Sequence, residues 1–526
     1  MRDHTVEVDR SGPHATFKFA DNFNVAVPFI DRHLKEGRAD KMAIRVVDGE
    51  EVTYGELAEK VNRCGNALLD LGIKKGQRLL FMVKDCPEFH YVFWGAIKAG
   101  IMPVPLNTLL RAKDYAYIIG NSEAAAVIYS PEFAAEVVPG VEQASHTPLV
   151  TMSVEGDGDN LKDLIAAASP DLEPNPAKPE DDCLWLYSSG STGDPKGVVH
   201  GQTHMVYTSE LYGVGIISMA EDDIVFSAPK LFFAYGLGAA MTFPLWVGAE
   251  AILYAPAPTP GAMFDVIEKY RPTVYYGVPT LYAAQLKMLE ERDADQSCIR
   301  AAMSAGEALP PDMFHRWKEK TGITLLDAIG TTEMLHIFIC NTPQQHRVGA
   351  TGLVVPGYDA RIVGEDGEDL PPGEIGALTV RGGSQLKSYW DNPEKNKSTI
   401  VDGWVRTGDT YYQDEDGFFF CCGRSDDMLK VGGIWCSPVE IEAKLVEHSK
   451  VLEAAVVGRA DEAELIKPEA YIVLNDAGDA GDALEAELLE HCKSGLARYK
   501  YPRWFNFVDD LPKTATGKIQ RFRLRS

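Results

Sequence analysis

The chain has 526 residues, which is enough for several hydrophobic cores and two to four domains. Its composition, 45% hydrophobic and 24% charged residues, is that of an ordinary globular protein. A formal net charge of −26 argues against a nucleic-acid surface, which needs a basic face, but leaves a local nucleotide site open.

The N-terminus, MRDHTVEVDRSG, is charged and lacks the apolar segment of a signal peptide. The nine cysteines are scattered and form no C-x-x-C pair, so neither a zinc site nor a disulfide framework is predicted. Reduced thiols in a cytoplasmic protein are the simpler interpretation.

A regular alternation of helices and strands begins at residues 50–75, where Thr53 is a plausible helix N-cap and Gly72 a stop. Short apolar strands then alternate with helices as far as ITLLDAIG at 323–330. Repeated strand–helix alternation predicts an α/β fold with a mostly parallel sheet covered by helices.

The stretch YSSGSTGDPKGVVH, at 187–200, combines hydroxyl side chains, glycines and one lysine. It fails the Walker A pattern and turns from one strand into the next rather than into a helix. Phosphate binding is favoured over a plain surface turn. The candidate phosphate ligands are Ser188, Ser189, Gly190, Ser191, Thr192, Gly193 and Lys196.

Residues 231–249 include 19 positions without a charge, nominally enough to span a bilayer. Three glycines and Pro244 interrupt them, and the only flanking basic residue is Lys230. A buried element that lines an apolar pocket is therefore favoured over membrane insertion.

The pattern changes after about residue 350, where short strands separated by Asp-Gly turns predict hairpins. Beyond Arg424 a smaller α+β pattern follows. We expect a large N-terminal domain over 1–424, with a β-rich part at about 350–424, and a small mobile C-terminal domain over 425–526.

Four later stretches resemble the first in kind: DAIGTTEM at 327–334, RTGDTYYQDEDGFFFCCGR at 406–424, GRSDDMLKVGG at 423–433 and LPKTATGKIQR at 511–521. All five, in this order, resemble the acyl-adenylate-forming superfamily, and the chain looks most like its benzoate–CoA ligase branch. The resemblance covers essentially the whole chain. It implies two half-reactions, in which a small aromatic carboxylic acid and ATP with Mg²⁺ give an acyl-AMP, and coenzyme A then displaces AMP.

The resemblance also implies a role for individual residues. Lys518, Thr332 and Glu333 would be catalytic, with Thr332 at the α-phosphate and Glu333 on magnesium, which prefers hard oxygen donors. Further nucleotide ligands would be Gly306, Glu307, Asp327, Thr331, Asp409 and Arg424. Asp426 would be the hinge of the C-terminal domain, and the face used with coenzyme A would carry Lys430, Gly432 and Gly433.

A dry slot for a small ring is expected beside the α-phosphate. Its residues would be Phe233, Ala234, Tyr235, Ala305, Gly330, His336 and Ile337. From sequence alone a core histidine is favoured for His336, and the resemblance reverses this preference to the pocket. No arginine or lysine is placed to pair a second carboxylate, so dicarboxylic acids are not expected as substrates. An apolar slot would discriminate only about 10²-fold against one ring hydroxyl, so hydroxybenzoates stay open as substrates.

Alternatives to the aryl-CoA ligase are a ligase for hydroxy- or aminobenzoate, a module that loads a carrier protein, a non-catalytic binder of the same fold and a luciferase-type oxygenase. The oligomeric state is open, with a homodimer as one candidate.

Overall fold

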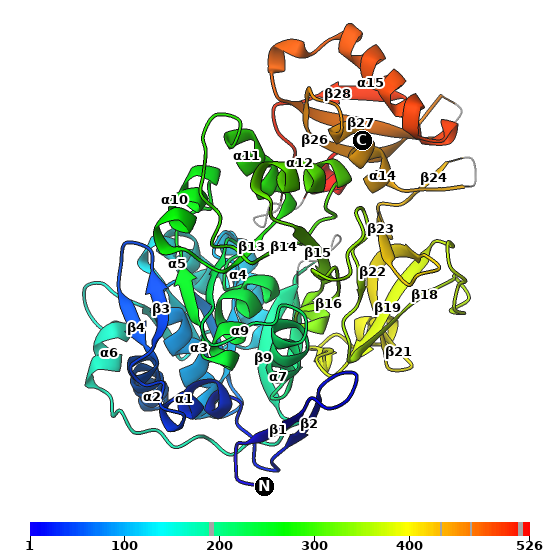
Figure 1. The fold of residues 1–526 in the computed structure, drawn as a ribbon. Helices are drawn as coiled ribbons and strands as arrows, with labels where there is room; N and C mark the ends of the chain where they lie inside the picture. The colour runs from blue at the N-terminus through cyan, green and yellow to red at the C-terminus, as the bar shows by residue number, and fades with distance from the viewer. Residues whose placement is uncertain (189–193, 432–433, 463–464, 514–518, 526) are drawn as a thin grey trace.

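The computed structural model describes residues 1–525 except 189–193, 432–433, 463–464 and 514–518 (Figure 1). Its largest sheet has nine strands in the order β17-β16-β15-β14-β13-β11-β12-β3-β4. The six strands from β15 to β3 pair in parallel, and β4, β16 and β17 are antiparallel. The strands are β3 (Met42–Val46), β4 (Glu51–Thr53), β11 (Ile224–Ser227), β12 (Glu250–Leu253), β13 (Val274–Gly277), β14 (Ala301–Ala305), β15 (Leu325–Gly330), β16 (Ile337–Cys340) and β17 (Leu353–Val354).

A second, wholly parallel sheet has the order β6-β5-β7-β8. Its strands are β5 (Arg78–Met82), β6 (Met102–Pro105), β7 (Ala126–Tyr129) and β8 (Val150–Ser153). The two prolines of β6 lie on an edge strand, where a missing N–H donor is tolerated. The predicted α/β class is confirmed by these two sheets.

A third sheet, β20-β10-β9, corrects one detail of that prediction. The apolar run CLWLY, at 183–187, is one of the strands whose alternation with helices predicts a mostly parallel sheet, but β9 (Asp182–Ser188) pairs antiparallel with β10 (Lys196–Gly201). Only residues 189–195 separate the two strands, too few for the crossover that a parallel pair needs. β20 (Ser388–Tyr389) adds antiparallel on the other edge of β10.

Helices lie on the outside of the sheets (Figure 1). Thr53 begins α2 with a capping box, in which its side chain and that of Glu56 satisfy each other's backbone N–H groups, as its sequence predicts. The helices of this region are α1 (Arg32–Lys35), α2 (Tyr54–Asp70), α3 (Pro87–Ala99), α4 (Ala112–Ser122), α5 (Ala134–Gln143), α6 (Leu161–Ala167), α7 (His204–Thr208), α8 (Ala234–Leu237), α9 (Phe243–Val247), α10 (Pro260–Tyr270), α11 (Pro279–Met288) and α12 (Pro311–Thr321).

The uncharged stretch 231–249 forms three short consecutive helical segments, α8, the π-helix η4 (Gly238–Thr242) and α9. Most of their residues are buried. Among the described residues, no helix is both long and apolar enough to cross a membrane. The prediction of a buried element is confirmed.

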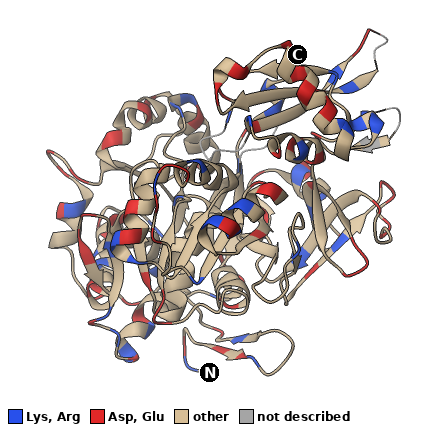
Figure 2. Ribbon diagram, turned by 45° about the horizontal axis from the view of Figure 1, so that its top comes forward, with Lys and Arg blue, Asp and Glu red and all other residues tan. Residues whose placement is uncertain are grey.

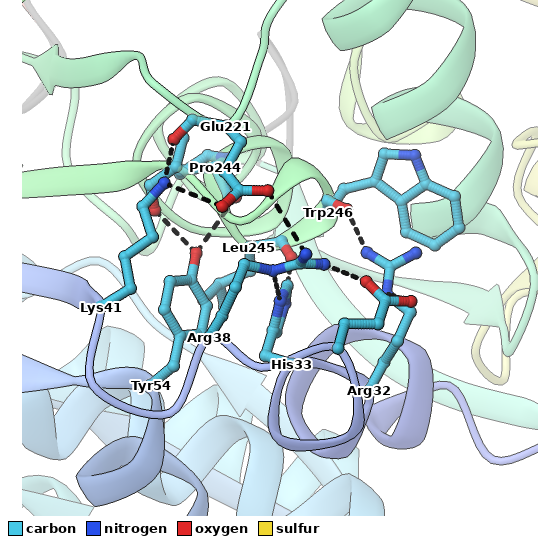
Figure 3. Close-up of polar contacts among 11 residues, drawn as sticks. Arg32, His33, Arg38, Lys41, Tyr54, Glu221, Pro244, Leu245 and Trp246 are labelled. Carbon is cyan, nitrogen blue, oxygen red and sulfur yellow. Dashed lines mark hydrogen bonds and ion pairs between the residues drawn. The ribbon is translucent and has the colours of Figure 1, made fainter.

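The carboxyl end of α9 is held by the N-terminal region (Figure 3). The imidazole of His33 donates from Nε2 to the Leu245 carbonyl at 2.7 Å, and Arg32 donates to the Trp246 carbonyl. Tyr54 donates to the Ala249 carbonyl at 2.7 Å. These groups satisfy carbonyls that a helix end leaves without partners, and the cation suits the negative end of the helix dipole.

Hairpins follow residue 350, as their Asp-Gly turns predict. They contain β18 (Tyr358–Val363), β19 (Gly376–Gly382), β21 (Ile400–Val401), β22 (Trp404–Gln413) and β23 (Phe419–Arg424), with α13 (Pro393–Thr399) between β20 and β21. The C-terminal part contains β24 (Leu429–Val431), β25 (Ile434–Cys436), α14 (Pro438–Val446), β26 (Val451–Ala460), β27 (Ile466–Leu474), α15 (Asp482–Gly495) and β28 (Trp504–Phe507).

The C-terminal part has its own hydrophobic cluster, formed by residues between Leu429 and Cys492. The N-terminal hairpin of β1 (Val6–Asp9) and β2 (Thr16–Phe19) lies at the opposite end of the molecule (Figure 1). Figure 2 shows charges of both signs spread over the outer helices and loops, while the central strands are mostly uncharged.

Candidate active site

Neighbouring parallel strands bring two glycine turns to the same edge of the large sheet. β14 and β15 are in register, with Ala305 opposite Ala328, so both strands end at this edge. β14 is followed by Gly306, whose φ of +96° favours glycine, and β15 ends at Gly330. In open α/β sheets, ligands bind outside the carboxyl ends of the strands.

A single turn of 3₁₀-helix, η5 (Thr332–Met334), follows β15. Thr331 caps it, because its hydroxyl oxygen accepts from the Met334 N–H at 3.2 Å. The hydroxyl of Tyr389, a residue of β20, donates to Oε1 of Glu333 at 2.8 Å. The predicted catalytic pair Thr332 and Glu333 is therefore half-buried on a short, well-held turn.

Two of the predicted nucleotide ligands face each other across a hairpin. Asp409 of β22 and Arg424 of β23 are cross-strand partners, and Nη1 of Arg424 lies 3.0 Å from Oδ1 of Asp409. Burial lowers the pKa of Arg424, but the carboxylates of Asp409 and Glu333 outweigh it and the net shift is upward. The side chains of Glu333, Tyr389, Asp409 and Arg424 are called the nucleotide side below.

Two other predicted nucleotide ligands differ in setting. Glu307 accepts a hydrogen bond from the Ile519 N–H at 3.2 Å, so the last part of the chain reaches this edge of the sheet. Asp327 is only 7% exposed, and burial raises its pKa well above the usual range. Of these two residues Asp327 is therefore the more buried, and Glu307 is the one in contact with the last part of the chain.

The predicted acyl-pocket residues also converge. Gly330 and Ile337 are partners in the β15–β16 ladder, and Nε2 of His336 donates to the Tyr235 carbonyl at 3.2 Å. Phe233 precedes α8, and Phe233, Ala234 and Tyr235 are half-buried, whereas Gly306 and Gly330 are exposed. The residues Ala234, Tyr235, Ala305, His336 and Ile337 are called the acyl side below.

His336 is 3% exposed and surrounded by aromatic rings. The ring centroids of Phe243 and Tyr212 lie 4.5 and 5.2 Å from that of His336. Burial lowers the pKa of His336 to about 3, so its imidazole is neutral at physiological pH. A neutral histidine among aromatic rings is a better neighbour for an apolar substrate ring than a charged histidine would be.

The remaining predicted residues stand as follows. Ser188 and Lys196 are opposite each other at the ends of β9 and β10. Asp426 lies in the exposed turn between β23 and β24, and Lys430 is exposed on β24. Outside the described residues lie Ser189, Gly190, Ser191, Thr192, Gly193, Gly432, Gly433 and Lys518.

Two residues of the site were not predicted from the sequence. Tyr389 is 56 residues from Glu333 in the chain, so no local pattern links them. His200 ends the KGVVH segment, and its Nε2 donates to the Thr332 carbonyl at 2.8 Å. The pairing of β20 with β10 brings Tyr389 and His200 to the same turn, and this pairing joins strands that are far apart in the sequence.

The donor set at η5 fits a magnesium ion. Glu333 offers a carboxylate, and a carboxylate that gives one oxygen to Tyr389 keeps a second for a cation. Mg²⁺ typically uses one or two protein carboxylates together with substrate phosphates. Bound there, the ion would neutralise phosphate charge, while the residues of the chain hold the carboxylate in place.

Comparison with known proteins points to one family. The profile of AMP-binding enzymes matches residues 31–390, and that of the AMP-binding enzyme C-terminal domain matches residues 440–518. A benzoate–CoA ligase of Thauera aromatica is 46% identical over 99% of this chain and 100% of its own length. A 4-hydroxybenzoate–CoA/benzoate–CoA ligase of Rhodopseudomonas palustris is 43% identical over 96% of this chain and 94% of its own.

Solved structures agree with this grouping. A benzoate CoA ligase from Burkholderia xenovorans superposes with a TM-score of 0.88 at 43% identity, covering 96% of this chain and 100% of that one. An anthranilate CoA ligase in complex with anthranoyl-AMP gives a TM-score of 0.92 at 39% identity, covering 96% and 97%. The backbone is thus similar to ligases for differently substituted aryl acids.

Proposed function

Since the chain belongs to the AMP-binding enzyme family, we propose that it is an ATP-dependent ligase that joins benzoate to coenzyme A. The carboxylate of benzoate attacks the α-phosphate of ATP, and pyrophosphate leaves. The thiol of coenzyme A then attacks the carbonyl of benzoyl-AMP, and AMP leaves. The products are benzoyl-CoA, AMP and pyrophosphate.

The observation that carries this proposal is the segment 330–337. Glu333 of the nucleotide side and His336 of the acyl side are three positions apart on it. If the ring of benzoate packs near His336, its carboxylate would therefore lie close to a phosphate that is held near Glu333. Positioning of this kind supplies much of the rate in phosphoryl-type transfer.

The individual roles follow from the geometry. Asp409 offers an acceptor for ribose hydroxyls, and Nη1 of Arg424, 3.0 Å from Oδ1, holds that carboxylate in place. Thr331 and Thr332 present hydroxyls at the end of β15. We assign Lys518 to the charge that develops between carboxylate and α-phosphate, and the turn at Asp426 to a hinge that brings the face of Lys430 into place for the thiol step.

Benzoate is preferred to its substituted analogues because the acyl side is neutral and buried. The two most identical relatives named above both act on benzoate by name, and the relatives named for hydroxybenzoate alone or anthranilate are less identical, at 31–39%. Ligation of 4-hydroxybenzoate is the second candidate, because one of those two relatives carries both names.

Pyrophosphate release, measured across benzoate, hydroxybenzoates, anthranilate and acetate, tests the proposal. We expect release with benzoate, and AMP release that requires coenzyme A. A chain that reacts well with acetate or a fatty acid, and with no aryl acid, does not have the proposed activity. A carrier-loading module would release pyrophosphate but would not transfer benzoyl to free coenzyme A.

We place the reaction in the cytoplasm, where thiols stay reduced, because all nine cysteines are free thiols and six of them are at most 3% exposed. Light scattering on the purified chain will distinguish a monomer from the candidate homodimer.

A further inference from the structure

The turn η5, which carries the proposed magnesium ligand Glu333, is held by groups from β10 and from the segment that precedes β20. His200 of β10 donates to the Thr332 carbonyl at 2.8 Å, and the Leu386 N–H donates to the Glu333 carbonyl at 2.6 Å. Ser384 donates from its hydroxyl to the Met334 carbonyl at 2.7 Å. Every carbonyl of this turn is therefore engaged, and its backbone has little freedom.

The side chain of Glu333 is held separately, by Tyr389. The hydroxyl of Tyr389 donates to Oε1 of Glu333 at 2.8 Å, and Tyr389 is only 4% exposed. Bonds to phenol hydroxyls are directional, so this contact selects one orientation of the carboxylate plane.

Tyr389 is itself fixed at its backbone. The side chain of Asn396, from α13, accepts from the Tyr389 N–H at 2.6 Å and donates to its carbonyl at 2.9 Å. Tyr389 also pairs with Val198 of β10, the strand that carries His200. The backbone and the carboxylate of the turn are thus both held through contacts with β10. This strand begins at Lys196, one of the candidate phosphate ligands.

We propose that Tyr389 is a positioning residue that aims the Glu333 carboxylate at the divalent cation of the nucleotide. One carboxylate oxygen is occupied by the phenol, and the other is directed to the metal. Groups of this kind, one step removed from a metal, typically change metal affinity 10- to 100-fold when they are removed. The inference rests on the proposed function for the presence of ATP and its metal ion.

Mn²⁺ binding in the presence of ATP, followed by electron paramagnetic resonance without any aryl acid, tests this role. We expect Tyr389→Phe to weaken Mn²⁺ binding about tenfold or more, since the phenol bond is lost while the ring remains. In turnover, the Mg²⁺ concentration for half-maximal rate should rise similarly. Saturating Mg²⁺ should restore most of kcat, and KM for benzoate should not change.

Tyr115→Phe is the matched control. It removes another buried phenol bond, to the Asn107 carbonyl at 2.8 Å, on a helix that carries no predicted site residue. It should lower thermal stability without changing Mn²⁺ binding. Asn396→Ala covers the case in which Tyr389→Phe fails to fold, because it keeps the phenol and only loosens its backbone, and it should weaken Mn²⁺ binding less.

The outcomes are separable. Unchanged Mn²⁺ binding in folded Tyr389→Phe, or in Asn396→Ala where the first variant is unfolded, overturns the role of Tyr389 alone. A wild-type chain that binds no Mn²⁺ with ATP overturns the proposed function and this role together. A wild-type chain that binds Mn²⁺ and ATP but ligates no aryl acid refutes the proposed substrate, and the variant still decides the role of Tyr389.

Discussion

Where Asp409 meets Arg424, the two side chains are 13% and 46% exposed and carry opposite charges, whereas His336 is 3% exposed and neutral. The nucleotide side is held by hydrogen bonds and ion pairs that reach across strands. The acyl side is held by packing, with ring contacts such as that between His336 and Phe243 at 4.5 Å.

This difference determines how each side should respond to change. A site built from charged groups that remain partly in water binds its ligand more weakly when a charge is removed, but it tolerates changes of side-chain volume. A packed apolar surface tolerates loss of charge and is sensitive to one added methyl group. Substitutions should therefore separate the kinetic constants for ATP from those for benzoate.

The largest effect is expected from Lys518→Ala, because Lys518 is assigned to the point where both sides meet. Losing one preorganised charge of this kind costs about 10²–10³ in rate. Benzoyl-AMP formation should fall by that factor, while supplied benzoyl-AMP and coenzyme A should still give the thioester. Rapid-quench assays of each half-reaction measure this, and an equal loss in both would assign Lys518 a structural role.

Asp409→Ala should raise KM for ATP about a hundredfold, because charged hydrogen bonds contribute about 1.5–3 kcal/mol each and two ribose hydroxyls lose their acceptor. KM for benzoate at saturating ATP should stay the same. Asp359→Ala is the control, since it breaks an exposed cross-strand pair with Arg381 in the same sheet, where such pairs contribute little. Parallel increases in both KM values would contradict the separation of the two sides.

Ala305→Val should raise KM for benzoate about tenfold, equivalent to about 1.4 kcal/mol of overpacking, and leave KM for ATP unchanged. Ala305 is 3% exposed and borders the acyl side. Ala302→Val, on the same strand but in a different hydrophobic cluster, should cost similar stability without a change in either constant. If the Ala302 variant also loses benzoate affinity, the effect is not local to the pocket.

The smallest effect concerns pH. Burial lowers the pKa of His336 from 6.5 to about 3, so the stabilising contribution of its neutral form is complete above pH 6.5 and declines as the pH falls toward 3. The decline is about 1.4 kcal/mol per pH unit. Urea unfolding of the wild type and His336→Gln should show their difference changing by about half of this slope between pH 7 and 6, and by nearly all of it between pH 6 and 5. A constant difference would mean that His336 titrates normally and that the acyl side is wet.

Much of the fold is predictable from local patterns. The Thr53 cap, the hairpin that places Asp409 opposite Arg424 and the strands around the glycine turns all depend on neighbours in the sequence. The pairing of β20 with β10 and the contact of Tyr389 with Glu333 depend on residues far apart in the chain. Periodicity carries no information on such pairs, because strand order is decided by packing of the whole domain.

Gly238 has a consequence for how the substrate range of this pocket could change by mutation. A Cβ built on Gly238 would lie 2.3 Å from the imidazole of His336, closer than any real Cβ contact. A single methyl group there must displace the rings of both His336 and Phe243, so substitution at this position is blocked unless these neighbours change first. Natural or laboratory evolution toward larger aryl acids is therefore expected to pass through His336 and Phe243 before Gly238, and the order of those steps is set by sterics.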